Sequence, residues 1–153
     1  MPRLGLRFFL PEAFGQVVYD GFGPTESYID KHHACWRQRF ASTAEGMHTD
    51  YIRPQENGSR CGCTEITLTN AKGEGLRVRG SDAFSFSASP YTQEELAAKG
   101  HKTELVKSGF TVLCLDAFHC GVGSASCGPA LLPRYTLREE EIRFTWLFDR
   151  LPG

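Results

Sequence analysis

The chain has 153 residues, of which 41% are hydrophobic and 23% are charged, and its formal net charge is −1. These values are typical of a soluble globular protein, so we expect residues 1–153 to form one domain that buries about 70% of its unfolded surface. A nearly neutral chain gives no electrostatic reason to expect nucleic acid or an anionic membrane as a partner. No apolar run approaches the roughly 20 residues of a membrane span. The expected location is the cytoplasm, unless an export signal lies upstream.

Alternating apolar residues predict strands in the first half of the chain. Residues 28–39 are ambiguous, and residues 41–50 are small and polar, which favours a loop. The adjacent His32 and His33 would point to opposite faces of a strand, so they are not expected to share a metal ion. The predicted strands are residues 4–10, 16–20 and 60–70, and residues 35–40 could form another.

The second half of the chain continues the strand pattern, with one helix. Thr92 followed by Glu95 is typical of a capping box, which predicts a short helix over residues 93–99 that Gly100 closes. Residues 121–133 are rich in Gly, Ser and Pro and predict a long loop. The predicted strands here are residues 76–80, 83–89, 103–106, 110–119 and 142–148, and the last of these has the clearest alternation.

Many short strands, regular turn signals and one small helix predict an all-β fold, namely an antiparallel β-sandwich. No internal repeat, low-complexity tract or linker interrupts the chain. The alternation also predicts which aromatic residues form the core. The residues expected to be mostly buried are Phe84, Phe86, Phe144, Trp146 and Phe148.

The six cysteines are expected to be reduced and to act as small hydrophobic residues. A zinc site formed by Cys61, Cys63, His119 and Cys120 is the alternative. One residue separates Cys61 from Cys63, whereas zinc sites prefer two to four. We therefore expect no metal in this chain.

Residues 51–62 form the most distinctive segment. Pro54 fixes its own φ and holds Arg53 in an extended conformation, and Asn57-Gly58 predicts a tight turn with positive φ. Arg53, Gln55, Glu56, Asn57 and Arg60 crowd this segment with hydrogen-bond donors and acceptors. The ordinary interpretation is a solvated turn between two strands.

This segment resembles the Arg/Phe-Pro-x-Glu-Asn-Gly-x-Arg run in the C-terminal domain of the family-two β-galactosidases, which are long-chain glycoside hydrolases. Residues 21–30 are similar to that family's Gly-x-Gly-Pro-x-Glu-x-Tyr-x-Asp, and residues 115–123 read Leu-Asp-Ala-Phe-His-Cys-Gly-Val-Gly. The three motifs occur in family order, and the similarity runs from about residue 4 to residue 148.

The resemblance implies a galactose-mutarotase-like supersandwich, of which this chain would be the C-terminal portion. The parent enzyme would hydrolyse terminal non-reducing β-D-galactosides such as lactose, and as a full-length enzyme it would be a homo-oligomer. The catalytic glutamates would lie on a barrel domain, and Mg²⁺ and Na⁺ would be bound on other domains, so this chain would hold no cofactor. It would pack on the upstream barrel and sandwich domains, shape the rim of the active site and be inactive alone.

The candidate carbohydrate-facing residues are Arg53, Glu56, Asn57, Arg60, His119 and Cys127. We expect the first five to converge, because two strand-end segments carry them. No catalytic residue is assigned, although Glu26, Glu65 and Asp116 are further carboxylates. In the family, the loop after residue 123 carries a tryptophan that stacks on the aglycone side of the substrate, and Cys127 stands there instead. A cysteine cannot provide such an aromatic face.

Two alternatives from other classes remain. A free-standing carbohydrate-binding sandwich would need an exposed aromatic row, but Trp36 and Trp146 both have plausible core positions. An aldose-epimerase-like enzyme would need a His and a Glu that converge in a cleft, for which His119 and Glu56 are available. Analogy of fold alone is weak support for function.

Overall fold

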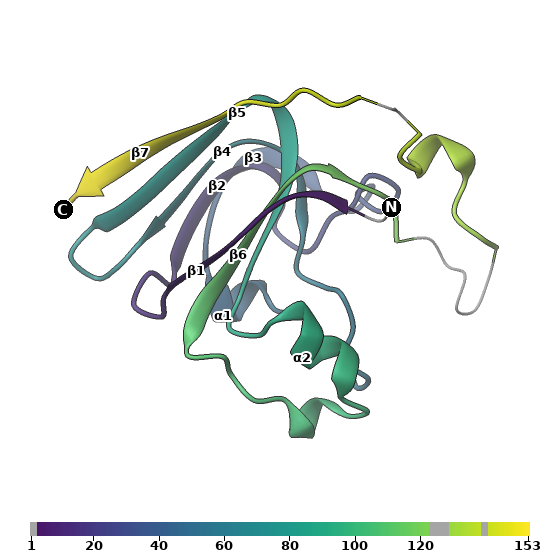
Figure 1. Cartoon of the computed structure of the whole chain (residues 1–153), viewed down its shortest axis with the longest axis horizontal. Coiled ribbons are helices and arrows are strands. Elements are labelled where there is room, and N and C mark those ends of the chain that lie inside the picture. The colour runs from purple at the N-terminus through teal and green to yellow at the C-terminus, as the bar shows by residue number, and fades with distance from the viewer. Residues whose placement is uncertain (1–2, 123–128, 139–140) are drawn as a thin grey trace.

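The computed structural model describes residues 3–122, 129–138 and 141–153 (Figure 1). The helices in this part are α1 (Ala44–Met47) and α2 (Gln93–Ala98), with two 3-10 turns, η1 (Lys102–Glu104) and η2 (Pro133–Tyr135). The strands are β1 (Arg3–Pro11), β2 (Gln16–Gly23), β3 (Trp36–Thr43), β4 (Arg60–Thr69), β5 (Glu74–Ser89), β6 (Phe110–His119) and β7 (Trp146–Pro152). No described helix has the length and apolar character needed to cross a membrane.

The strands form an antiparallel sheet with the order β1-β6-β5-β4-β2-β3, and β7 also pairs with β5. β5 takes part in both layers of the fold (Figure 1): its first half pairs with β7, whereas Ser85–Ser89 pairs with β6. The register between β4 and β5 shifts between Cys63 and Glu65. An irregularity of this kind allows a strand to bend. The prediction of an all-β antiparallel sandwich is confirmed.

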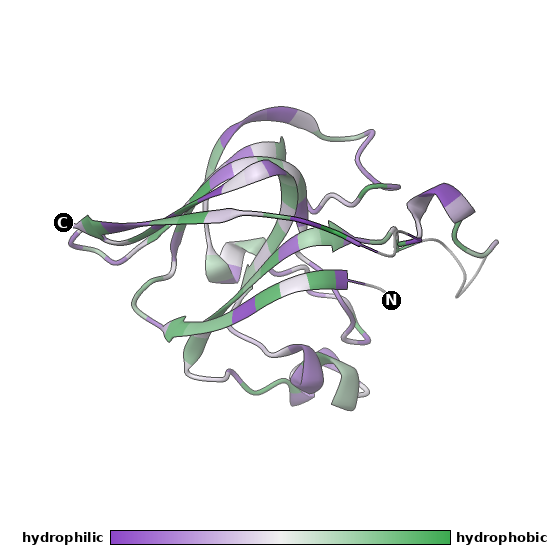
Figure 2. Ribbon diagram, turned by 45° about the horizontal axis from the view of Figure 1, so that its top comes forward, coloured by the Kyte–Doolittle hydropathy of each residue, from purple (hydrophilic) through white to green (hydrophobic). Residues whose placement is uncertain are grey.

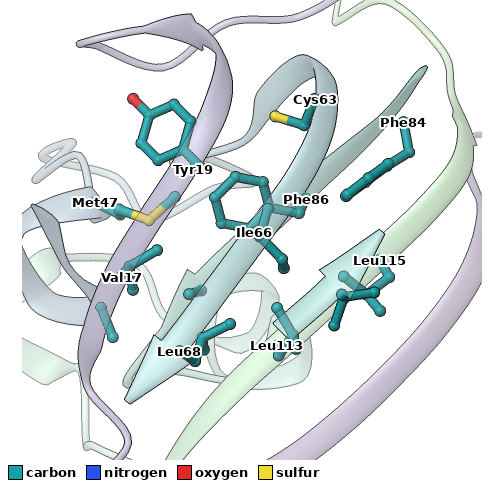
Figure 3. Packing of buried hydrophobic residues seen from close by; sticks show 13 residues of the cluster. Val17, Tyr19, Met47, Cys63, Ile66, Leu68, Phe84, Phe86, Leu113 and Leu115 are labelled. Atoms are coloured by element: carbon teal, nitrogen blue, oxygen red, sulfur yellow. The ribbon is translucent and has the colours of Figure 1, made fainter. Parts of the chain in front are cut away.

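The core lies between these layers (Figure 3). Alternate residues of β2, β4 and β5 point inward, as the period of a strand requires, and α1 adds a methionine from the side. Full burial of one such large side chain contributes about 1.5–3 kcal/mol. The buried cluster consists of Val17, Tyr19, Ala44, Met47, Cys63, Ile66, Leu68, Val78, Phe84, Phe86, Ala88, Leu113 and Leu115.

The predicted aromatic core is correct in its first members and wrong in its last. Phe84 and Phe86 are buried, while Phe144 and Trp146 are only partly buried against the cluster. Phe148 is 44% exposed, because β7 pairs only with β5 and nothing described covers its far side. Trp36, which had a plausible core position, is 54% exposed on the edge strand β3.

The capping box predicted at Thr92 is confirmed, whereas the sequence pattern does not predict the two other capped elements, α1 and η1. Thr92 accepts a hydrogen bond from Glu95 N and starts α2 as predicted, and the helix ends at Ala98, just before the expected Lys99. The strand predicted at residues 103–106 is wrong: the His101 side chain caps the short 3-10 turn η1 there. Similarly, Thr43 caps α1 inside the expected loop.

The two adjacent histidines do not lie on a strand, so the expectation that their side chains point to opposite faces is wrong. They precede β3, and the rings of His32 and His33 stack with centroids 5.2 Å apart. The His32 ring also lies 5.1 Å from that of Phe22, and its Nδ1 lies 2.9 Å from Tyr28 O.

Candidate functional site

Three segments that are far apart in the sequence meet in one cleft, which we call the polar cleft. Its volume is about 680 Å³, within the range of roughly 300–1,000 Å³ that is typical of small-molecule sites. One segment follows β2, the second precedes β4 and the third follows β6. They are the three segments that carry the sequence motifs. The lining residues are Arg3, Glu26, Tyr28, Lys31, Tyr51, Gln55, Glu56, Gln93, His119, Cys120, Gly121 and Val122.

Glu26 links the first two segments. Its side chain is only 8% exposed, and its Oε1 accepts hydrogen bonds from Lys31 Nζ at 2.7 Å and from the Tyr51 hydroxyl. Its Oε2 accepts from Gly58 N at 3.1 Å and from Thr49 Oγ1 at 3.4 Å. A buried carboxylate needs such donors, because burial without them carries a large desolvation cost.

These contacts determine the protonation state of the group. Burial would raise the pKa of Glu26, but the hydrogen bonds from Lys31, Tyr51 and Gly58 N outweigh it and lower that pKa. The hydrogen bond to Glu26 in turn raises the pKa of Lys31, and burial followed by Glu26 raises that of Tyr51. At neutral pH the site therefore holds a carboxylate, an ammonium and a phenol. A carboxylate of this kind is a poor general acid.

Arg3 links the ends of β1 and β6 on one side of the polar cleft. Its Nε and Nη2 donate to Asp116 at 3.0 and 2.5 Å, and its Nη1 donates to Glu56 at 3.1 Å. The Asp116 side chain is 3% exposed. Burial would lower the pKa of Arg3, but these two carboxylates raise it. Gly5 allows the close approach, because a Cβ there would lie 2.0 Å from Leu115 O.

Arg60 lies behind the polar cleft and does not line it. It is buried, its Nε donates to the Tyr19 hydroxyl at 3.1 Å, and its Nη2 donates to Pro24 O at 3.0 Å. Its Nη1 donates to Gly58 O and Ser59 O. None of these acceptors is a carboxylate. The guanidinium therefore holds the loop before β4 against the loop after β2.

Asn57 does not line the polar cleft, and its hydrogen bonds hold the segment before β4 that does. It is buried, its Oδ1 accepts from Thr49 N at 2.9 Å, and its Nδ2 donates to Gln55 O at 2.9 Å. Gly58 has the predicted positive φ, at +72°. The solvated-turn interpretation of this segment is wrong, because Asn57, Ser59 and Arg60 are buried.

The sequence-predicted residues thus fall into separate groups. Glu56 and His119 line the polar cleft, and the His119 ring lies 5.5 Å from the Tyr28 ring, with its Nδ1 2.8 Å from Cys120 O. Asn57 and Arg60 are supports. Arg53 is exposed and lies outside the lining, so it does not join the other residues. Cys127 lies outside the described residues.

Sequence reasoning missed two important members. In the sequence Glu26 is only one carboxylate among several, although its place in the Gly-Pro-x-Glu motif is a signal that could identify it. Arg3 carries no motif, and its partner Asp116 is 113 positions away. Nothing in the local sequence indicates that pairing.

The cysteines behave as small buried or partly buried residues. The five within the described ranges are free, and burial raises the pKa values of Cys61 and Cys63, which keeps both thiols protonated. Across the described residues, no three His, Cys, Asp or Glu side chains gather closely enough to hold a metal ion. The structure therefore gives no support to zinc at Cys61, Cys63, His119 and Cys120.

Comparison with known proteins agrees with the three motifs. The family model described as "Beta galactosidase small chain" matches residues 1–148. A β-galactosidase of Actinobacillus pleuropneumoniae is 49% identical over 152 residues, which are 98% of this chain and 15% of that protein. One of Staphylococcus xylosus is 36% identical over 146 residues, which are 95% of this chain and 15% of that protein. The chain thus spans about 15% of the length of these relatives, and it belongs to the β-galactosidase small-chain family.

Proposed function

We propose that this chain is one part of a β-galactosidase that hydrolyses terminal non-reducing β-D-galactosides such as lactose. In that enzyme it packs on the catalytic barrel and forms part of the rim of the active site. The observation that carries the proposal is the polar cleft, in which the three motif segments meet. Its wall includes residues 119–122, directly before the loop that, by the family resemblance, reaches toward the substrate.

The state of the two cleft carboxylates supports placing the catalytic groups elsewhere. Glycoside hydrolysis normally needs one carboxyl group that can donate a proton and a second one about 5–5.5 or 6.5–9.5 Å from it. Glu26 is held ionised by several donors, and Glu56 is paired with Arg3. The lowered pKa of Glu26 does not suit a general acid near neutral pH. The Glu26 and Glu56 carboxylates are better suited to holding neighbouring segments of the enzyme in place.

The remaining features of the proposed enzyme follow the family resemblance. The chain would be the C-terminal part of a mutarotase-like supersandwich, in one polypeptide with barrel and sandwich domains. Mg²⁺ and Na⁺ would be bound by those other domains, the assembled enzyme would be a homo-oligomer, and its location would be the cytoplasm. In these respects the proposal rests on the relatives, whose additional length leaves room for such domains.

Reconstitution tests the proposal. The probe is the A. pleuropneumoniae β-galactosidase without the segment matched by this chain, produced as a separate protein. We expect neither part alone to cleave a chromogenic galactoside, and the mixture to do so. Turnover by this chain alone that is abolished by Glu56→Gln would contradict the proposal, and would make Glu56 a catalyst.

One observation keeps the aldose-epimerase alternative testable. His119 and Glu56, the pair it requires, both line the polar cleft. Polarimetry of freshly dissolved α-D-galactose with the chain alone separates the two functions. Accelerated mutarotation that is lost in His119→Ala would favour the epimerase, whereas an unchanged rate agrees with the galactosidase proposal.

A further inference from the structure

The Asn57-Gly58 dipeptide is a place where the chain can modify itself. When a backbone nitrogen attacks the side-chain amide carbon of the preceding asparagine, a succinimide ring forms and ammonia leaves. Water then opens the ring to aspartate or isoaspartate. A following glycine favours the attack most, because it has no Cβ to hinder its nitrogen. The chain has two asparagines, Asn57 and Asn70, and only Asn57 precedes a glycine.

The fold does not allow this glycine to be exchanged for a residue that would make Asn57 less reactive. Gly58 has a φ of +72°, in the left-handed region that residues with a Cβ rarely adopt. A Cβ at this position would also lie 2.6 Å from Met47 O, which is too close for a normal contact. The turn before β4 therefore depends on the residue that makes its neighbour labile.

In the folded chain, the reacting atoms of the dipeptide are held by hydrogen bonds. The Asn57 side chain accepts from Thr49 N and donates to Gln55 O, each at 2.9 Å, and the residue is only 8% exposed. The attacking atom, Gly58 N, donates its proton to Glu26 Oε2 at 3.1 Å. Ring closure takes the proton from Gly58 N and the amide nitrogen from Asn57, so it breaks the hydrogen bonds that both atoms donate.

Glu26 holds the attacking nitrogen without activating it. Burial would raise the pKa of Glu26, but its hydrogen bonds from Lys31, Tyr51 and Gly58 N lower that pKa. A carboxylate with a lowered pKa is a weak base, and it does not remove the proton of a backbone amide. The contact between Glu26 and Gly58 N therefore opposes the reaction.

We propose that Asn57-Gly58 is a modification site that the fold keeps closed: Asn57 stays intact while Glu26 holds Gly58 N, and it deamidates when this segment opens. Gly58 N forms a bond to the side-chain amide carbon of Asn57, the carbon–nitrogen bond of that amide breaks, and the proton of Gly58 N leaves with the ammonia. Water is the second reactant, because it adds to the ring and opens it. No group is oxidised or reduced.

The modified segment cannot return to the same arrangement. Aspartate at position 57 has no N–H to donate to Gln55 O, and it brings a second negative charge into the buried turn that Glu26 holds. Isoaspartate also lengthens the backbone before Gly58. Since Gln55 and Glu56 of the same segment line the polar cleft, opening of this wall becomes irreversible once the reaction has occurred. The inference does not depend on the proposed function.

Peptide mapping by mass spectrometry tests the inference on the wild-type chain. The 153-residue chain is kept at pH 8, either folded or unfolded in guanidinium chloride, and samples are digested with trypsin over time. Residues 40–60 and 61–72 are released as separate peptides with one asparagine each, because Pro54 protects Arg53 from cleavage. We expect Asn57 to deamidate about tenfold more slowly, or slower still, in the folded chain than in the unfolded chain.

Asn70 is the internal control. It lies at the tip of the hairpin between β4 and β5, beside the C-terminus, which Figure 2 shows largely in hydrophilic purple. Its Oδ1 accepts from Lys72 N and Glu74 N, but the residue that follows it is Ala71. In the unfolded chain, Asn57 should therefore deamidate faster than Asn70. In the folded chain, this difference should disappear.

Matched variants isolate the contribution of Glu26. Glu26→Gln loses the charge-assisted hydrogen bond to Gly58 N, so Asn57 should deamidate about tenfold faster in this folded variant than in the folded wild type. Glu65→Gln is the control, because Glu65 forms its ion pairs with arginines instead, and it should deamidate at the wild-type rate. Far-UV circular dichroism verifies that both variants fold, and the wild-type comparison needs no variant.

Several results would overturn the inference. Deamidation of Asn57 as fast in the folded chain as in the unfolded chain would show that the site is not closed, and faster reaction in the folded chain would make Glu26 a promoting base. Equal rates at Asn57 and Asn70 in the unfolded chain would show that the dipeptide is not labile. Equal rates in Glu26→Gln and Glu65→Gln would remove Glu26 from the account.

Discussion

The polar cleft and the outer face of the sheet contain the same kinds of charged residues in opposite surroundings. On the outer face, Arg79 pairs with Asp149 at 2.9 Å, and Arg39 reaches Glu65 at 3.5 Å, and all four side chains are exposed or partly exposed. Around the cleft, Glu26 and Asp116 are almost fully buried, and each accepts at least two hydrogen bonds. Exposed pairs such as the outer ones contribute little to stability, whereas the hydrogen bonds of Glu26 and Asp116 join segments that are far apart in the sequence.

The energetic scale follows from burial. Removing one partner of a buried, hydrogen-bonded charge pair typically costs about 3–5 kcal/mol, because the other charge is left uncompensated. An exposed pair contributes about 0–1 kcal/mol. The predictions below apply this contrast to Glu26 and Glu56, which line the polar cleft, and to Asp116, which pairs with the lining residue Arg3.

The largest effect is expected for Asp116→Asn. The change leaves the Arg3 guanidinium without its two-point carboxylate partner, so the free energy of unfolding should fall by about 3–5 kcal/mol. Urea unfolding followed by fluorescence measures it. Asp149→Asn is the matched control on the outer face and should change stability by about 0–1 kcal/mol. Equal losses in the two variants would remove the distinction between the regions.

Glu26→Gln should have a smaller effect that depends on pH. At pH 7 the loss of charge-assisted hydrogen bonds should cost about 1.5–3 kcal/mol. The folded protein lowers the pKa of Glu26 below its ordinary value of 4.5, so its stabilisation is fully present above pH 4.5. It is lost as the pH falls through the lowered pKa. The stability difference between wild type and variant should therefore shrink in acid, and a difference that stays constant from pH 7 to pH 3 would contradict the assignment.

Glu56→Gln should have the smallest effect on stability. Glu56 is only partly buried and has one ion pair, to Arg3, which keeps Asp116 as a partner. We expect a change of about 0–1 kcal/mol by urea unfolding, as for an outer pair. Loss of activity in the reconstituted enzyme at this small cost would identify Glu56 as a residue of the site. A large loss of stability would show instead that it belongs to the structural network.

These differences also show what the sequence could reveal. The strands around Ile66, Leu68, Phe84 and Phe86 follow from alternation, and α2 follows from its Thr92 cap, because these signals are local. Phe148 shows the same alternation and is exposed, since its burial depends on which strand lies beside β7. Alternation reports two faces of a strand and does not report whether a neighbour covers them.

The candidate site was predictable to the extent that it lay in motifs. Glu56 and His119 were found because their segments resemble family signatures, and both line the polar cleft. Arg60 was grouped with them, but its donors turn toward backbone carbonyls behind the cleft. The pairing of Arg3 with Asp116 depends on β1 lying beside β6, which is a property of the tertiary fold.

The central claim is that the polar cleft is required for the activity of the assembled β-galactosidase. Galactosidase activity after reconstitution, compared between Glu26→Gln and Glu65→Gln at pH 7, tests it most directly. Glu65 is the matched control, because it is a glutamate with two ion pairs on the outer face. With both variants folded and present in the complex, we predict wild-type activity for Glu65→Gln and a clear loss for Glu26→Gln. Equal activity of the two variants would contradict the claim.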